Sequence, residues 1–136
     1  MVGGGGDDSI TTLAGDNWLD GGPGSDLLDG GTGRDTADYT NDPGPDGIIA
    51  NLSDAAIVVG AESVASGQVR DGGSGFDTLI SIEAVVGSAA ADSLFGGDAV
   101  DGLYGGGGSD LIVGHGGADE IAGTGGDDTL EGGAGA

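Results

Sequence analysis

A nine-residue period runs through most of this 136-residue chain. It is clearest at residues 105–131, where three consecutive units read GGGGSDLIV, GHGGADEIA and GTGGDDTLE. Each unit opens on glycine, carries Asp at its sixth place and has a large aliphatic residue at its eighth. Turn preference alone does not enforce a fixed period, so the array indicates stacked copies of one structural unit.

The period is also present near the start of the chain. Four units fill residues 3–38. In the second of them Asn17 replaces the Asp, so that turn has one carboxylate fewer and any ion site there should be weaker. In the fourth unit the small Ala37 stands at the eighth place, which suggests that a first block of repeats ends there.

A stretch without the period separates this block from the later repeats. Residues 39–71 begin with a turn-rich run, and short strands are expected after it at 48–52 and 56–59. The period returns at Gly72, and residues 81–86 are expected to form a six-residue strand. We therefore expect one domain with three parts, which are a first repeat block at 1–38, an insertion of loop and short strands at 39–71, and a second repeat block at 72–136.

The residue types of the unit suit a hard cation. Glycine adopts turn conformations that other residues avoid and lets backbone carbonyl groups approach an ion. Asp supplies a short carboxylate, and Ca²⁺ prefers about six to eight oxygen ligands in flexible geometry. One glycine turn supplies part of such a shell, and an equivalent turn in the next coil can supply the rest. The aliphatic residue at the eighth place should point inward and form a thin apolar core.

This array resembles the RTX (repeats-in-toxin), or haemolysin-type, calcium-binding nonapeptide G-G-x-G-x-D-x-U-x. The resemblance implies an all-β fold, namely a parallel β-roll (a right-handed β-helix or solenoid) with two nonapeptides in each coil. It also implies that the first six residues of each unit bind Ca²⁺ and the last three form a strand. Insertions in such arrays are expected to pack on one side of the roll.

Two units per coil would place turns on the same side 18 residues apart in the sequence. Each ion should then lie between two such turns, which yields about five candidate sites: Asp8 with Asp26, Asn17 with Asp35, Asp92 with Asp110, Asp101 with Asp119, and Asp110 with Asp128. Asp77 is a further expected ligand, but it stands beside the break in the period and no partner can be assigned to it. The resemblance implies that backbone groups of the turn glycines complete the coordination, namely those of Gly3, Gly4, Gly6, Gly21, Gly22, Gly24, Gly30, Gly31, Gly33, Gly105, Gly106, Gly108, Gly114, Gly117, Gly123 and Gly126.

The charge of the chain points the same way. The formal net charge is −22, from 24 acidic residues against two arginines. A compact fold with this charge repels itself, and five divalent cations would cancel about half of it. No basic surface can be built, which excludes nucleic acid as a partner. No apolar run is long enough for direct membrane insertion. The chain has no Cys, so a metal rather than a disulfide should stabilise it.

The sequence gives no sign of catalysis, and we expect a protein that is not an enzyme. His115 is the only histidine and stands at a glycine place in a repeat, without an apparent nucleophile or orienting partner. The acidic residues lie in turns open to water, whereas a general acid needs an apolar setting. The aromatic residues look too scattered along the chain for a sugar-binding platform.

The leading interpretation is a secreted, extracellular or cell-surface module of bacterial origin that folds when it binds Ca²⁺. The resemblance implies export by a type I system, and we expect the chain to be a segment of a larger protein.

Two alternatives stay open. The first is a calcium-dependent structural protein, such as a fibre, surface layer or adhesin, that forms homo-oligomers by end-to-end stacking of uncapped solenoid ends. The second resembles the R-modules of alginate epimerases and would bind an acidic polysaccharide through calcium bridges.

Overall fold

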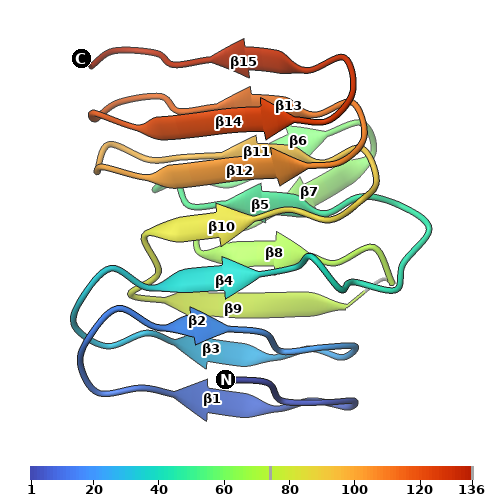
Figure 1. Ribbon diagram of the computed structural model, residues 1–136, viewed down its shortest axis with the longest axis vertical. Helices are drawn as coiled ribbons and strands as arrows, with labels where there is room; N and C mark the ends of the chain where they lie inside the picture. The colour runs from blue at the N-terminus through green and yellow to red at the C-terminus, as the bar shows by residue number, and fades with distance from the viewer. Residues whose placement is uncertain (74, 136) are drawn as a thin grey trace.

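The computed structural model describes residues 1–73 and 75–135 as a stack of short strands, with the chain ends at opposite ends of the stack (Figure 1). Short strands follow from the repeat, because the glycine-rich turn takes six of the nine residues. The described residues contain no helix, and hence none long and apolar enough to cross a membrane. The strands are β1 (Ser9–Thr11), β2 (Trp18–Leu19), β3 (Leu27–Asp29), β4 (Thr36–Asp38), β5 (Ile49–Asn51), β6 (Ile57–Val59), β7 (Glu62–Val64), β8 (Gln68–Arg70), β9 (Phe76–Ile80), β10 (Ala84–Val86), β11 (Ser93–Phe95), β12 (Gly102–Gly106), β13 (Leu111–Val113), β14 (Glu120–Thr124) and β15 (Thr129–Glu131).

The strands form two main sheets. One has five strands in the order β14-β12-β10-β4-β2, all paired in parallel. The other has eight strands in the order β1-β3-β9-β8-β5-β11-β13-β15, and β8 alone runs antiparallel to its neighbours. Ile10 lies opposite Leu28, and Ile112 lies opposite Leu130, so neighbouring coils are offset by 18 residues. The all-β class, the mostly parallel pairing and this offset are confirmed, whereas right-handed winding stays a prediction.

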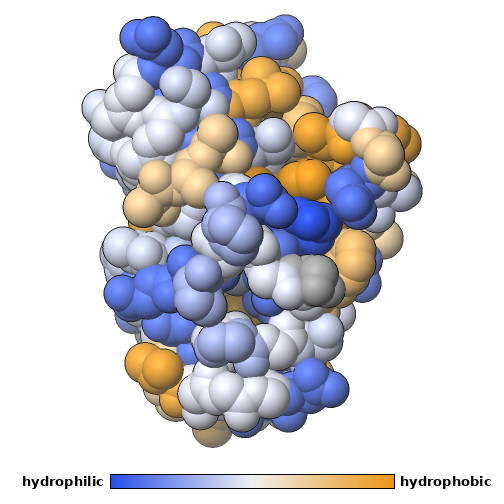
Figure 2. Space-filling model, turned by 90° about the vertical axis from the view of Figure 1, so that its right-hand side faces the viewer, coloured by the Kyte–Doolittle hydropathy of each residue, from blue (hydrophilic) through white to orange (hydrophobic). Residues whose placement is uncertain are grey.

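The core is a row of aliphatic side chains between the sheets. The eighth-place residues Leu19, Leu28 and Leu94 are completely buried. The small Ala37 is buried too. The Tyr39 side chain belongs to the same apolar cluster, so the core still contains a large side chain in this part of the chain. On the side of the molecule in Figure 2, apolar residues lie in separate patches among pale and hydrophilic ones.

The insertion enters the eight-stranded sheet. β5 pairs in parallel with β11 and antiparallel with β8, and β8 pairs antiparallel with β9. The expected strands at 48–52 and 56–59 are found as β5 and β6, but β7 and β8 were not predicted. The expectation that the insertion packs on one side of the roll is therefore wrong for β5 and β8, since the fully buried Val69 places β8 in the core. β6 and β7 form a separate hairpin.

The five-stranded sheet bypasses the insertion. β4 pairs directly with β10, with Ala37 opposite Val85. The eight-stranded sheet therefore extends beyond the five-stranded one at both ends of the stack, where β1 and β15 lie outside β2 and β14 (Figure 1).

The junction after β9 corrects one prediction. Residues 81–86 do not form a six-residue strand, because only Ala84–Val86 is extended as β10. Ser81 has a φ of 50° and turns the chain towards β10. The segment is thus a shortened repeat in which Val85 takes the eighth place and is completely buried.

The core predicts unequal costs for one kind of substitution. Leu94→Ala empties a completely buried site and should lower the free energy of unfolding by about 2–5 kcal/mol. Leu130→Ala is the matched control, because this side chain is 51% exposed and its truncation leaves little cavity. Urea denaturation in saturating Ca²⁺ measures both. Equal costs would contradict a core that lies between the sheets.

Candidate metal sites in the stacked turns

The glycine turns stack so that the carbonyl groups of one coil meet the turn of the next. Gly22 has a φ of 89°, and a Cβ atom there would lie 1.9 Å from the carbonyl oxygen of Gly4. Gly108 has a φ of 103°, and a Cβ atom there would lie 2.4 Å from the carbonyl oxygen of Ala90. Only glycine fits these positions, because any side chain would displace a carbonyl group of the preceding coil.

The predicted glycines fall into two classes. Those at the first place face the Asp of their own turn, where a Cβ atom would lie within 3 Å of its side chain: Gly3, Gly21, Gly30, Gly105, Gly114 and Gly123. The others stand at the second or fourth place with positive φ: Gly4, Gly6, Gly22, Gly24, Gly31, Gly33, Gly106, Gly108, Gly117 and Gly126.

Most sixth-place carboxylates join two coils through one of their oxygens. The Oδ1 atom of Asp26 accepts a hydrogen bond from the backbone N–H of Asp8 at 2.7 Å. The same bond joins the other predicted pairs, from Asn17 to Asp35 at 2.8 Å, Asp92 to Asp110 at 2.9 Å, Asp101 to Asp119 at 3.0 Å and Asp110 to Asp128 at 3.0 Å. The 18-residue spacing therefore predicts which turns touch.

The second oxygen of several carboxylates is buried without a hydrogen bond. This holds for the Oδ2 atoms of Asp8, Asp26, Asp35, Asp110 and Asp119. These atoms are directed into the glycine turn, since a Cβ atom on Gly21 would lie 2.2 Å from Oδ2 of Asp26. A buried carboxylate oxygen without a partner is costly, and a cation beside it would offset that cost.

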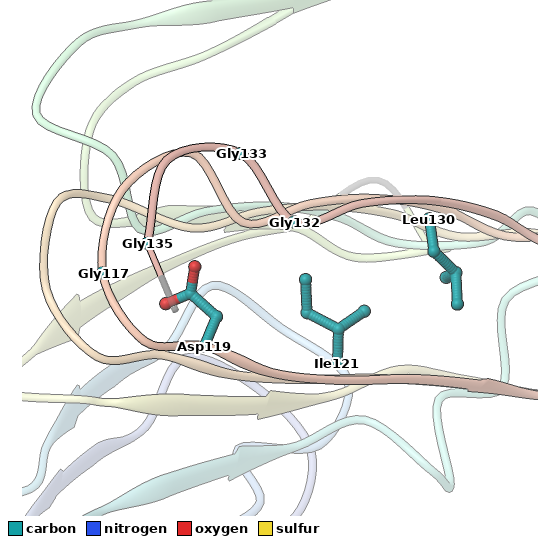
Figure 3. Close-up of a pocket in the computed structure, with 7 residues that line it drawn as sticks. All are labelled: Gly117, Asp119, Ile121, Leu130, Gly132, Gly133 and Gly135. Carbon is teal, nitrogen blue, oxygen red and sulfur yellow. The ribbon is translucent and has the colours of Figure 1, made fainter.

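Asp119 shows the geometry most openly. Its carboxylate points between the turn that contains Gly117 and the turn of Gly133 and Gly135, and Ile121 and Leu130 lie farther along the same hollow (Figure 3). The hollow has a volume of about 310 Å³. A cation beside Asp119 could therefore reach backbone carbonyl groups of two successive turns.

Burial raises the pKa of several of these acids. Desolvation is the largest cause for Asp26, Asp101 and Asp110, and hydrogen bonds from backbone N–H groups offset part of it. For Asp77 and Asp92 desolvation raises the pKa to about 6. Burial thus disfavours the charged form of these carboxylates, and a cation nearby would favour it.

Three predicted ligands have more complete bonding within the protein. Asp77 accepts the Asp26 N–H on Oδ1 and the Tyr39 hydroxyl on Oδ2, both at 2.8 Å. Asp92 accepts the Ser88 N–H on Oδ2 at 2.7 Å and the Ile48 N–H on Oδ1 at 2.7 Å.

The third of these ligands is Asp101, which accepts the Gly97 N–H on Oδ2 at 2.6 Å. The partner of Asp77, which the sequence could not assign, is Asp26.

Glu83 is a site residue that the sequence analysis missed. Its Oε2 atom accepts the N–H of Asp35 at 2.8 Å, the bond that a sixth-place Asp makes elsewhere. The signal was available, because Glu83 stands two residues before Val85, the spacing between Asp and the aliphatic residue in every regular unit. The shortened repeat concealed it.

The donor set favours calcium over a transition metal. No group of three or more His, Cys, Asp or Glu side chains that could hold a metal occurs among the described residues. Each pair of turns offers at most two sixth-place carboxylates, and the other donors directed into the turns are carbonyl oxygens. An all-oxygen set with flexible geometry is what Ca²⁺ prefers, whereas structural Zn²⁺ takes mainly sulfur and nitrogen ligands.

Sequence comparison agrees with this geometry. The family model described as RTX calcium-binding nonapeptide repeat (4 copies) matches residues 2–37, 82–112 and 113–136, which is more than half of the chain. The unmatched stretch contains the inserted strands β5 to β8 together with β9. A search of curated proteins gave no match.

The raised pKa values predict how acid affects the calcium-free protein. An unfolded Asp has a pKa of about 3.9, whereas burial raises the pKa of Asp77 and Asp92 to about 6. The folded state therefore binds protons more tightly, and this contribution to stability is full below the unfolded pKa and lost as the pH rises through 6. Lowering the pH from about 7 to 5 should increase the folded fraction in metal-free buffer, measured by far-ultraviolet circular dichroism. A folded fraction that grows with pH would contradict these environments.

Proposed function

We propose that this chain, which belongs to the RTX calcium-binding nonapeptide repeat family, binds several Ca²⁺ ions between its stacked turns and folds into a β-roll as it binds them. The observation that carries the proposal is the set of five buried Oδ2 atoms without a hydrogen bond. An ion beside these atoms would supply the missing positive charge. Because such a site does not exist in the unfolded chain, the free energy of ion binding becomes free energy of folding.

The number and strength of the sites follow from the pairs of turns. Five pairs would take about five ions and cancel about half of the net charge of −22. Affinities in the range of about 10⁻⁴–10⁻³ M, typical of extracellular calcium modules, would suffice outside a cell. Neighbouring sites share a carboxylate, as Asp110 does between Asp92 and Asp128, so ions should bind cooperatively.

This coupling suits a secreted protein. At the low calcium concentration of a bacterial cytosol the acidic chain would stay unfolded and fit for export, and it would fold in calcium-rich surroundings outside. We therefore propose an extracellular, non-catalytic module. The environment of His115 supports this role, because the exposed ring packs on Phe95 and its Nδ1 atom lies 2.9 Å from the carbonyl oxygen of Gly96.

A calcium titration tests the proposal. Isothermal calorimetry and far-ultraviolet circular dichroism on chelator-treated protein should show cooperative binding together with a gain of β signal. Mg²⁺ should not replace Ca²⁺, because it demands a rigid octahedral shell. A chain that is fully folded in chelator and does not bind Ca²⁺ would sink the proposal.

Substitution of Asp110 should weaken calcium binding selectively. Asp110→Asn removes a carboxylate that serves two pairs of turns and should lower the stoichiometry by about one or two ions. Asp98→Asn is the matched control, because it removes the same charge from an exposed residue outside the sixth place. Equal losses in both variants would mean that calcium responds to net charge and not to the turns.

Asp77 should behave differently from Asp110. Its two oxygens already accept hydrogen bonds from Asp26 and Tyr39, so Asp77→Asn should leave the number of bound ions unchanged. Calorimetry on this variant, compared with the Asp110 variant, measures the difference. A lost ion would place Ca²⁺ at the junction between the blocks despite the tyrosine.

A further inference from the structure

The outer face of the five-stranded sheet carries a hollow that the calcium sites do not use. It has a volume of about 490 Å³ and is lined by residues of β2, β4, β10 and β12 and of the turns before β2 and β4. Trp18 lines it from β2 and Tyr104 from β12, and the small residues Thr36 and Ala84 lie between them. Because β4 pairs directly with β10, residues from both repeat blocks meet on this face.

The two aromatic side chains project on the same side of the sheet. Trp18 stands one place before the buried Leu19, and Tyr104 stands one place after the buried Leu103, so both point away from the core. Trp18 is 57% exposed. Trp18 and Tyr104, which are far apart in the sequence, therefore lie on one face of the folded chain.

The span of the hollow suggests an elongated ligand. β4 and β10 separate β2 from β12. Neighbouring strands lie about 4.8 Å apart, so the two aromatic residues are roughly 14 Å apart across the sheet, a span of about three sugar units. The register also places Tyr104 two residues farther along its strand than Gly102, the residue in line with Trp18. Aromatic residues that enclose a small cation stand within about 6 Å of it, so this wider pair does not form such a cage.

Arg34 places hydrogen-bond donors beside Tyr104. Its Nη2 atom lies 3.5 Å from Oε2 of Glu120, and its side chain is 45% exposed. A Cβ atom on Gly102 would lie 2.8 Å from Nη2 of Arg34 and 3.1 Å from Cε2 of Tyr104, so glycine at this place lets the guanidinium group lie next to the ring. The other arginine, Arg70, pairs with Glu62 on the insertion, away from this face.

The charge of the protein selects among possible ligands. Anionic polymers, including nucleic acids and uronate chains, would meet a protein that stays acidic even with five bound ions. A neutral ligand carries no such penalty. An oligosaccharide has flat apolar faces, which pack on aromatic rings. It also has hydroxyl groups, which can pair with Arg34 and with the carboxylate of Asp16.

We propose that this hollow binds a neutral oligosaccharide of about three sugar units, with Trp18 and Tyr104 against the faces of its rings and Arg34 on its hydroxyl groups. The proposal goes beyond calcium binding and needs the ion only for the fold that joins β4 to β10. A neutral-glycan site on this face differs from an acidic-polysaccharide site, because the latter would hold its ligand through calcium bridges.

Trp18 is the only tryptophan in the chain, so its fluorescence reports on this face alone. Cellohexaose, xylohexaose and maltohexaose would be titrated in saturating Ca²⁺, with a hexameric oligogalacturonate as the acidic comparison. At least one neutral glycan should give a saturable change. Titration with the disaccharide and the trisaccharide of the same series should show an affinity that increases between these two and changes little up to the hexasaccharide. Absence of a change with all three neutral glycans, or a change with the uronate alone, would overturn the proposal.

Variants then locate the site, with calorimetry as the readout and circular dichroism in Ca²⁺ as the check of folding. Trp18→Ala and Tyr104→Ala should each lower the affinity at least about tenfold, as loss of a stacking contact does. Trp18→Phe keeps an aromatic ring and should retain part of the affinity, which would show that the loss in Trp18→Ala comes from the missing ring and not from a folding defect. Phe76→Ala is the matched control, because this aromatic residue is 39% exposed on β9 of the other sheet. Unchanged affinity in both alanine variants would overturn the proposal, even if a glycan binds elsewhere.

Discussion

The structure depends on how one carboxylate is shared between two coils. The sixth-place Asp uses Oδ1 to accept the N–H of the equivalent residue in the preceding coil, which fixes the stacking of the turns. In four of these residues, and in Asp8 of the first coil, Oδ2 is buried in the glycine turn without a hydrogen bond. The same side chain therefore positions the coils and creates the demand for a cation. At a net charge of −22 these stacked carboxylates repel one another, which is why we propose a cation between them.

The two sheets respond differently to the insertion. In the five-stranded sheet, β4 pairs directly with β10, with Ala37 opposite Val85. In the eight-stranded sheet, the inserted strands β5 and β8 become part of the sheet. Between β3 and β9 the turn is completed by protein groups, because the Tyr39 hydroxyl bonds to the Asp77 oxygen that would otherwise lack a partner. A tyrosine thus replaces at the junction what a cation would do within a block. The continuous sheet in turn brings Trp18 and Tyr104 to one face.

The local structure could be predicted from the sequence because it repeats. The period predicted the short strands, the buried eighth place and the contact between turns 18 residues apart, as the pair of Asp92 and Asp110 illustrates. The junction could not be predicted. The pairing of Asp26 with Asp77 spans 51 residues and depends on where the inserted strands settle, and Glu83 stands in a repeat shortened by the turn at Ser81. Contacts across an aperiodic segment leave no spacing in the sequence.

The most direct test of the account is a crystal structure of the calcium-loaded protein with anomalous scattering measured to locate the ions. We expect ions between turns 18 residues apart, at about 2.3–2.6 Å from the Oδ2 atoms of Asp8, Asp26, Asp35, Asp110 and Asp119. We expect none against Oδ2 of Asp77, which the Tyr39 hydroxyl occupies. Turns without ions, in which water or protein donors satisfy these oxygens, would contradict the claim that calcium completes the fold.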